Sequence, residues 1–424
     1  MRTALSGLTT RGRCLLAAGV SLAVCATLLG QRDLLRAAVF LLGLPLAAVV
    51  LVSRTRYRLA CGRQLDPPRV EAGRTATVRL RLDNVSRLPS GVLLMEDALP
   101  FSLGGRPRFV LDRVEPKGVR EVSYPVRSEV RGRFRVGPLS VRLTDPFGLV
   151  ELTRSFSAAD DLVVTPVVSP LPAVRLGGDW SSGGEAAARA VSAAGQDDAA
   201  TREYREGDDL RKVHWRSTAR VGELMVRREE QPFTSRGTLL LDARLVAHRG
   251  QGPGSSLEWA VSAVASIGVA LLQQSYALRL LDDGGTDLVP TGAALTEGPL
   301  LDALAGVQPS LRASLDGATE QLRRGGVDGV LVAVLGTLQA AEAEQLSRLR
   351  HGAGTCVAVL VDSTTWGGPR AGAAGIAHEA AATLLRRTGW RVLTVAHGTT
   401  LASVWPEAST RSGRGADVAA GGLR

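Results

Sequence analysis

Two continuous apolar runs decide the fold class of the C-terminal half: Val327 to Leu335 (VDGVLVAVL) and Thr355 to Val361 (TCVAVLV). Runs of this kind, without polar and apolar residues in alternation, are typical of strands that are buried on both faces of a sheet. Helical stretches follow both runs, at Ala340 to Arg350 and at His378 to Arg387. This alternation of strands and helices predicts a mostly parallel sheet that is covered by helices on both faces.

The same pattern extends in both directions, so we assign residues 237–400 to one α/β domain and residues 401–424 to a tail without predicted structure. The remaining predicted elements are a strand at Gly237 to Asp242, a helix at Leu257 to Gln274 with Ser255 or Ser256 as N-cap, a strand at Tyr276 to Leu281 and a last strand at Arg391 to Val395. Sheets of this kind bind ligands at the carboxyl ends of their strands. Acidic residues stand at such ends, namely Asp242, Asp282, Asp283 and Asp362.

A charged segment precedes this domain, within residues 201–236. Arg202 to Arg220 reads REYREGDDLRKVHWRSTAR, in a chain with only 4% aromatic residues. We expect a turn at Glu206 to Asp208, and a short helix up to Trp215 that places Arg211 and Trp215 on one face. A strand is expected at Gly222 to Arg227. The candidate partner-binding or structural residues of this signature segment are Arg202, Tyr204, Gly207, Asp208, Arg211, His214, Trp215 and Arg220.

Catalysis and nucleic-acid binding are the weaker interpretations of the signature segment. His214 stands near Ser217 and several acids, but a catalytic triad must converge in space, and no G-x-S-x-G motif is present. Acidic residues interleave with the basic ones and would repel phosphates, so we expect no nucleic-acid partner. Aromatic and arginine side chains are typical anchors of protein interfaces. A protein-binding surface and internal packing therefore both remain open.

The spacing R-x-Y-x-x-G-D-x-x-R-x-V-H-W-x-x-T-A-R resembles the signature of the bacterial "domain of unknown function 58" family. Two upstream strings, Arg131 to Leu139 and Asp145 to Leu149, also resemble phrases of this family. The resemblance implies a von Willebrand factor A-like (Rossmann-like) fold for the α/β domain. In such domains the first strand leads into an Asp-x-Ser-x-Ser metal motif. Here Asp242 is followed by Ala-Arg-Leu-Val, so we expect neither a metal ion nor another cofactor.

The resemblance also implies partners. Such proteins are commonly encoded beside a MoxR-type AAA+ ATPase, and often beside a transglutaminase-like membrane protein. Since no G-x-x-x-x-G-K-[ST] loop is present, ATP chemistry would belong to the partner. We therefore expect a membrane-anchored cytoplasmic adaptor without its own catalysis, which acts in assembly or quality control at the membrane. The alternative is an enzyme that acts on protein or cell-envelope substrates.

The middle of the chain, residues 64–170, has the period-2 alternation of β-strands, and we expect a β-sandwich-like domain. The predicted strands include Thr77 to Leu82, Val119 to Tyr124, Phe134 to Val136 and Leu139 to Leu143. Asp145 to Gly148 predicts a turn whose Phe147 is buried at the end of the sandwich. Residues 171–200 are rich in Gly, Ala, Ser and Asp and are typical of a linker.

Two apolar runs predict an α-helical membrane hairpin in residues 1–63. They cover about residues 14–30 and 34–52, and each is nearly long enough to cross a hydrocarbon core of about 30 Å. Arginines are more frequent outside the runs than in the turn between them, which predicts a multi-pass cell-membrane protein with cytoplasmic soluble domains. A cleaved signal peptide or a lipidated Cys25 is the alternative.

Composition sets the outer limits. A chain of 424 residues with 45% hydrophobic residues has room for two or three folded units, and wholesale disorder is excluded. The net charge of +10 lies partly beside the apolar runs, which favours contact with membrane lipids. Cys14, Cys25, Cys61 and Cys356 have no regular spacing, so neither a disulfide framework nor a zinc site is expected.

Overall fold

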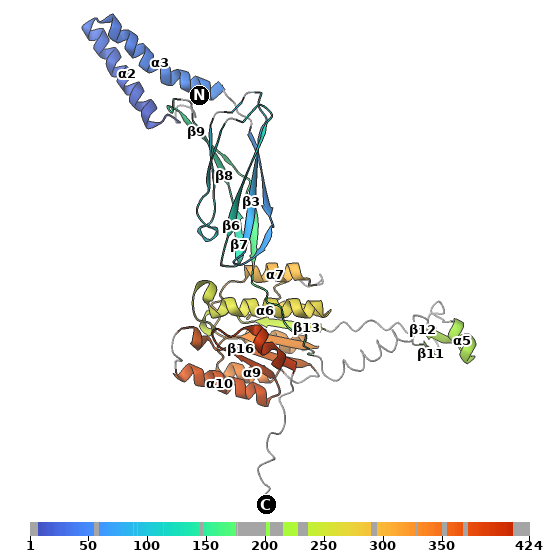
Figure 1. Cartoon of the computed structure of the whole chain (residues 1–424). Helices are drawn as coiled ribbons and strands as arrows, with labels where there is room; N and C mark the ends of the chain where they lie inside the picture. Colours follow the sequence, from blue (N-terminus) through green and yellow to red (C-terminus); the bar gives the residue numbers. More distant parts are fainter. Residues whose placement is uncertain are drawn as a thin grey trace, which may run out of the picture. The chain divides into compact units, whose positions relative to one another are not determined.

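The computed structural model divides the chain into two compact units, Met1–Thr165 and Pro166–Arg424, and each is described by itself. The described residues are 7–54, 59–87, 89–90, 92–112, 114–144, 147–174, 176, 201–203, 215–227, 236–289, 295–326, 329–349, 354–367 and 372–409. Figure 1 shows a helical hairpin and a β-domain in the first unit and an α/β domain in the second.

The first unit begins with two apolar helices, α2 (Thr10–Leu29) and α3 (Arg32–Arg54). Gly30 ends α2 in the left-handed region with φ of 63°, so the turn between the helices is only two residues long. Both helices are long and apolar enough to cross a membrane. The expected hairpin is therefore confirmed as a pair of apolar helices, which is consistent with membrane anchoring.

The β-domain of the first unit consists of three small sheets, with the strand orders β1-β3-β6, β5-β4-β8-β9 and β2-β10-β7. The strands are β1 (Leu59–Asp66), β2 (Arg69–Glu71), β3 (Thr75–Asn84), β4 (Leu93–Asp97), β5 (Arg108–Leu111), β6 (Val119–Arg127), β7 (Gly132–Val136), β8 (Leu139–Thr144), β9 (Glu151–Phe156) and β10 (Asp160–Thr165). A 3-10 turn, η1 (Phe101–Leu103), follows β4.

Alternating residues of these strands form one core. Val78, Leu80 and Leu82 of β3 are at most 1% exposed, and they belong to the same buried cluster as Met95 and Val141 of the facing sheet. The period-2 pattern thus identified a strand-rich domain correctly. None of the four cysteines, all of which lie in the described ranges, forms a disulfide.

The expectation of a buried Phe147 is wrong. The turn after β8 places Gly148 at a φ of 67°, as a tight turn requires, but the Phe147 side chain is 59% exposed. Leu149 and Val150 are buried instead, at 3% and 0% exposure. They pack against the base of the helical hairpin rather than inside the sandwich.

The second unit contains a fully parallel five-stranded sheet with the order β14-β13-β15-β16-β17. Its strands are β13 (Arg236–Leu241), β14 (Ala277–Leu281), β15 (Val330–Leu335), β16 (Thr355–Val361) and β17 (Arg391–Val395). The helices are α6 (Ser256–Gln273), α7 (Glu297–Gly306), α8 (Asp316–Gly325), α9 (Ala340–Ser347), α10 (Gly372–Arg387) and α11 (Leu401–Val404).

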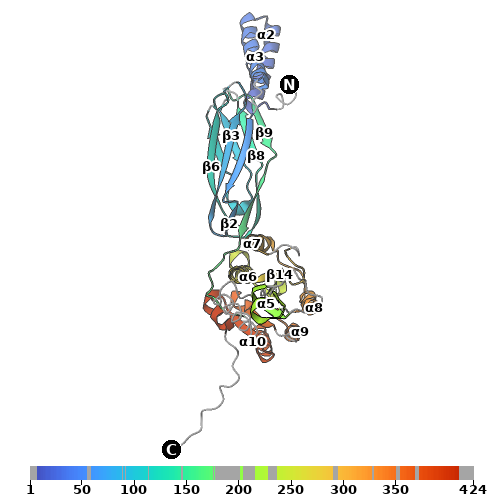
Figure 2. The same cartoon turned by 90° about the vertical axis from the view of Figure 1, so that its right-hand side faces the viewer.

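Helices cover both faces of this sheet, as the strand pattern predicted. Figures 1 and 2 show α6 and α7 on one face and α9 and α10 on the other. Odd-numbered and even-numbered residues of β13 accordingly belong to two different cores: Leu239 and Leu241 to that of α6, and Leu240 to that of α8 to α10. Burial in this core explains why α6 is apolar enough to resemble a membrane span, since 72% of its apolar window is buried.

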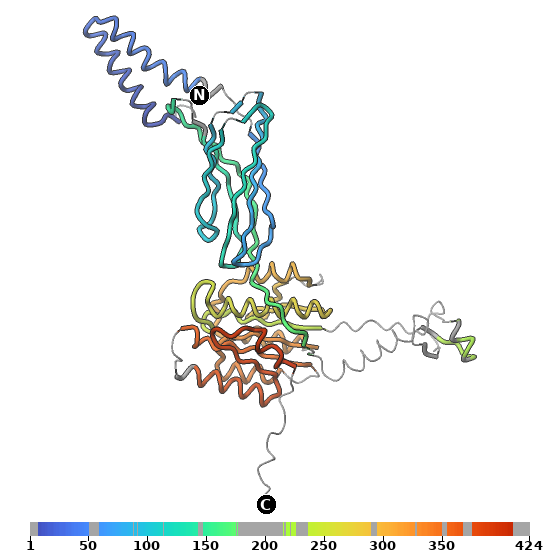
Figure 3. The backbone as a smooth tube through the Cα atoms, viewed as in Figure 1, coloured from blue at the N-terminus to red at the C-terminus, as the bar shows by residue number. Residues whose placement is uncertain are grey.

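The stretch after β10 joins this second core. Val174 and Leu176 are at most 5% exposed and belong to the cluster around α6, although they lie in the predicted linker 171–200. The amide of Ser169 donates to Ser266 Oγ of α6 at 3.0 Å, and Figure 3 shows the path of the chain beside this helix. Residues 177–200 lie outside the described residues.

Candidate functional site

The strand order of the α/β domain locates its candidate ligand site. The chain runs from the inner strand β13 to the edge strand β14, and then crosses to β15 on the other side of β13 and continues to the opposite edge at β17. In doubly wound sheets, ligands bind beyond the carboxyl ends of the two strands where this direction changes. Here these strands are β13 and β15, followed by Asp242 and Gly336 respectively.

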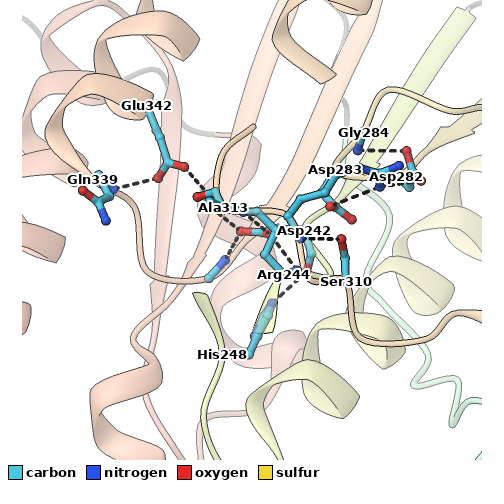
Figure 4. A network of polar contacts seen from close by, with 12 residues as sticks. Asp242, Arg244, His248, Asp282, Asp283, Gly284, Ser310, Ala313, Gln339 and Glu342 are labelled. Atoms are coloured by element: carbon cyan, nitrogen blue, oxygen red, sulfur yellow. Dashed lines mark hydrogen bonds and ion pairs between the residues drawn. The ribbon is translucent and has the colours of Figure 1, made fainter. Parts of the chain in front are cut away.

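A buried ion triad fills this position. The guanidinium of Arg244 donates from Nε to Asp242 Oδ1 at 2.9 Å and from NH2 to Asp242 Oδ2 at 3.0 Å. Its NH1 donates to Glu342 Oε1 of α9, a residue 98 positions later in the chain. The side chains of Arg244, Asp242 and Glu342 are at most 7% exposed. Figure 4 shows the guanidinium between the two carboxylates.

Backbone groups complete the triad. Gly336 donates its amide to Asp242 Oδ2 at 3.3 Å, and Ala313 accepts from Arg244 NH1 at 3.2 Å. Glu342 also accepts the amide of Gln339 at 2.8 Å, which caps the first turn of α9. Burial alone would lower the pKa of Arg244, but the hydrogen bonds and charges of Asp242 and Glu342 outweigh it and raise the pKa. The arginine therefore stays charged and joins the loop after β13, the loop between α7 and α8, and the start of α9.

Asp242 binds an arginine side chain in this structure. The sequence indicates a degenerate metal position at Asp242, because both serines of the motif are missing. In the structure, the positive charge beside Asp242 is supplied by Arg244, which uses both carboxylate oxygens. Within the described ranges, no group of three or more His, Cys, Asp and Glu side chains has the arrangement of a metal site.

His248 lies beside the triad and locks the following loop. Ser256 Oγ, which already accepts the amide of Arg249 at 2.9 Å, donates its proton to His248 Nδ1 at 3.0 Å. His248 Nε2 can then donate to the carbonyl of Asp242 at 2.7 Å, which corresponds to a neutral imidazole. Burial lowers the pKa of His248 and supports this state. The hydrogen bonds of Ser256 and His248 fix the conformation of this loop. Because Ser256 is 0% exposed, its hydroxyl is not accessible to a substrate.

The neighbouring acids Asp282 and Asp283 also have structural partners. Asp282 Oδ1 accepts the amides of Gly284 at 3.0 Å and Thr286 at 2.7 Å, which forms the tight turn after β14. Arg312 NH1 lies 3.3 Å from Asp282 and 3.4 Å from Asp283. The charge of Asp282 is the main reason why the pKa of Arg312 is raised.

Apolar side chains stand on the loops that the triad holds. Leu245 and Val246 follow Arg244 directly and are 50% and 68% exposed, and Leu311 is 88% exposed. The amide of Leu245 donates to Ser310 at 2.9 Å, and the amide of Ser310 donates to Ala243 at 2.7 Å. These bonds place Leu311 next to Leu245 on the carboxyl edge of the sheet. We call Leu245, Val246 and Leu311 the carboxyl-edge patch.

The signature residues fall into two groups. Arg202 lies on β11 (Thr201–Glu203), which pairs antiparallel with β12 (Met225–Arg227), while Trp215 and Arg220 lie on α5 (Trp215–Val221). Trp215 is 71% exposed, and Arg220 is also exposed. Thr218 Oγ1 of α5 accepts the amide of Met225 at 3.0 Å, which joins helix and strand. Tyr204, Gly207, Asp208, Arg211 and His214 lie outside the described residues.

Of the residues in and beside the triad, Asp242 could be identified from the sequence as a strand-end acid, whereas Glu342 and His248 could not. Glu342 reads as an ordinary first-turn helix residue, and only the fold brings it to Arg244. A weak signal for it exists, since Gln339 and Glu342 have the spacing of a capping box. The arginine two residues after a strand-end aspartate is the stronger signal, because a charge there requires a buried counter-charge.

The match to a family model falls within the second unit. The family model described as "Protein of unknown function DUF58" matches residues 200–386. "Uncharacterized protein YeaD" of Bacillus subtilis is 27% identical over 230 residues, 52% of this chain and 55% of that protein. The chain thus spans about half the length of the curated relative that it matches.

Solved structures match about a quarter of the chain. The CARDB domain of the PF1109 protein from Pyrococcus furiosus is 13% identical over 26% of this chain and 90% of its own, with a TM-score of 0.20. PapD-like domain 7 of human CEP192 is 12% identical over 26% of this chain and 85% of its own, with a TM-score of 0.17. Scores this low support no statement about fold.

Proposed function

Because residues 200–386 belong to the DUF58 family, as the signature segment indicated, we propose that this chain is a membrane-anchored adaptor. In this proposal the helices α2 and α3 anchor the protein, and the α/β domain binds a protein partner. The observation that supports it most is the carboxyl-edge patch: exposed apolar residues on loops that a buried ion triad holds rigid.

The physical argument starts from preorganisation. The leucine and valine side chains of the patch are 50–88% exposed. When a partner covers them, the free energy of the complex falls by about 25 cal/mol for each Å² of apolar surface that is buried. Loops that are already fixed lose little conformational entropy on binding, which increases the net affinity. Arg244 supplies the rigidity, and the patch supplies the contact area.

We further infer that the α/β domain is von Willebrand factor A-like in the wider sense. Such domains often engage ligands through a metal ion at the carboxyl edge. Here the cation beside Asp242 is a guanidinium with all three nitrogens engaged, so partner contact at this edge would be independent of metal. An apolar patch is the kind of surface that such contact requires.

The partner that the family resemblance favours is a MoxR-type AAA+ ATPase, with a transglutaminase-like membrane protein as a further candidate. Trp215 of the signature segment would add a second contact, because it is a large aromatic residue with 71% exposure. Assembly or quality control at the membrane is the role that this partnership would serve.

The test is affinity purification of the tagged, membrane-extracted full chain after mild crosslinking with ATP, followed by mass spectrometry. We expect recovery of an AAA+ ATPase, and a loss of at least about tenfold in the Leu245→Asp/Leu311→Asp variant, which corresponds to about 1.4 kcal/mol. The matched control is Leu245→Met/Leu311→Met, which keeps apolar area and should keep recovery. Equal recovery with the aspartate variant would show that the carboxyl-edge patch is not the binding surface. Recovery of no ATPase would contradict the proposed partner.

A further inference from the structure

The base of the helical hairpin is joined to the β-domain at the turn between β8 and β9. The amide of Thr9, the N-cap of α2, donates to the carbonyl of Leu149 at 2.9 Å, and its hydroxyl donates to Gly148 at 2.7 Å. The amide of Glu151 donates to Gly7 at 2.7 Å. Figure 1 shows β9 beside the start of α2. Residues 148–151 therefore lie at the level of the first turn of α2.

That level corresponds to a membrane boundary if the hairpin spans the bilayer. The 20 residues of α2 extend over about 30 Å, which equals the thickness of the hydrocarbon core. The first turn of α2 then lies where lipid headgroups meet acyl chains. Arg11 and Arg13, both exposed, are suited to headgroup phosphates at this depth.

Phe147 occupies this turn and is far more exposed than the two apolar residues that follow Gly148. Leu149 and Val150 are buried against Leu8, Ala48 and Val49 at the hairpin base. Phe147, two residues earlier, is 59% exposed. In membrane proteins this depth is enriched in the aromatic residues Trp and Tyr, and the turn that is hydrogen-bonded to the end of α2 places the exposed ring of Phe147 there.

We propose that Phe147 is an interfacial anchor whose ring inserts into the lipid boundary of the membrane that α2 and α3 span. The occupant of this surface is lipid, because the turn is continuous with the hairpin through the bonds of Thr9 and Gly7. The ring fixes the β-domain to the bilayer surface in addition to the helices. This inference rests on the proposed membrane anchoring.

The phenylalanines of the first unit provide a matched experiment. Phe40 on α3 is 69% exposed and serves as the lipid-facing reference. Phe101, 98% exposed, follows β4, which pairs with β8 so that Asp97 lies opposite Leu139 and Leu93 opposite Leu143. Phe101 is thus at the end of the β-domain that is opposite to Phe147. It is the control for an exposed ring far from the hairpin base.

The experiment places the photo-crosslinker p-benzoylphenylalanine at position 40, 101 or 147 of the full chain in native membranes. After irradiation, lipid adducts are identified by mass spectrometry of the purified protein. We expect phospholipid adducts at 40 and 147 in comparable yield and none at 101.

Each other outcome overturns the proposal in a distinguishable way. Adducts at 40 alone would leave membrane anchoring intact and exclude Phe147 from the lipid boundary. Adducts to a protein at 147 would identify a protein contact instead. Lipid adducts at 101 as well as 147 would show that exposure alone accounts for the signal. A lack of lipid adducts at 40 would contradict the membrane anchoring itself.

Discussion

Arg244 shows at the scale of one residue how this site differs from an open ligand crevice. Its guanidinium is 1% exposed and is the counter-charge shared by the buried carboxylates of Asp242 and Glu342. A buried ion pair often contributes little net stability relative to apolar residues, but removal of one partner is costly. We therefore infer that the main role of the triad is to fix the conformation of the loops.

We predict that Arg244→Met destabilises the α/β domain by about 3–5 kcal/mol, because Asp242 and Glu342 lose their counter-charge. Urea unfolding of the purified chain measures this, with the buried Trp390 and Trp405 as fluorescence reporters. The control is Arg323→Ala on α8, whose ion pair with Glu320 is exposed and contributes about 0–1 kcal/mol.

An Arg244→Met variant as stable as the Arg323→Ala control would contradict the assignment. Partial recovery of stability in an Arg244→Met variant that also has Asp242→Asn and Glu342→Gln would support it, since both buried charges are then removed. This triple variant separates the cost of unpaired charge from the loss of packing.

At the scale of elements, strand bounds and a helix cap could be predicted because local sequence patterns determine them. The strands β16 and β17 have their predicted bounds, and Ser255 caps α6 by accepting the amide of Glu258 at 3.2 Å. Helices α7 and α8 were missed. In α8, Ala318, Thr319 and Leu322 are buried at helical spacing, but the helix has only ten residues and glycine near both ends, so the pattern is too short to be recognised in the sequence. Whether such a short segment forms a helix depends on its packing in the tertiary structure.

The junction of hairpin and β-domain was also beyond local patterns, and Gly12 shows why. A Cβ at this position of α2 would collide with the carbonyl oxygen of Leu149. The helix approaches the turn so closely only because residue 12 has no side chain. Gly12 lies between two arginines before the first apolar run, and this local sequence does not show that it faces another segment; at Gly43 of α3, by contrast, a Cβ would meet no atom within 4 Å.

Gly12→Ala should weaken the docking of α2 on the β-domain by about 1–3 kcal/mol, the usual cost of overpacking. Hydrogen exchange of the full chain in nanodiscs measures the effect at the amides of Thr9 and Glu151, which donate across the junction. Gly43→Ala is the matched control and should leave both exchange rates unchanged. Unchanged rates in Gly12→Ala would mean that the junction does not form as described.

At the scale of the whole chain, the hydrogen bonds of Thr9 bear on the course of the protein through the membrane. Because Thr9 contacts Gly148 and Leu149, the start of α2 and the β-domain lie on the same side of any membrane that the hairpin crosses. This agrees with two crossings. Which side it is depends on charge: beside the turn, at the start of α3, Arg36 pairs with Asp33 at 3.0 Å, whereas the flanks of the hairpin contain unbalanced arginines.

The positive-inside tendency then predicts cytoplasmic soluble units. A reporter fused after Arg424 should be active only in its cytoplasmic form. Replacing Arg54, Arg56 and Arg58 with Asn, together with a basic turn in place of Gln31 to Asp33, should shift part of the population to the opposite orientation, since the difference in charge sets the orientation. A cytoplasmic result would keep the α/β domain in the compartment that contains ATP. An extracytoplasmic signal from the unmodified chain would separate it from any AAA+ ATPase, and would overturn orientation and partner together.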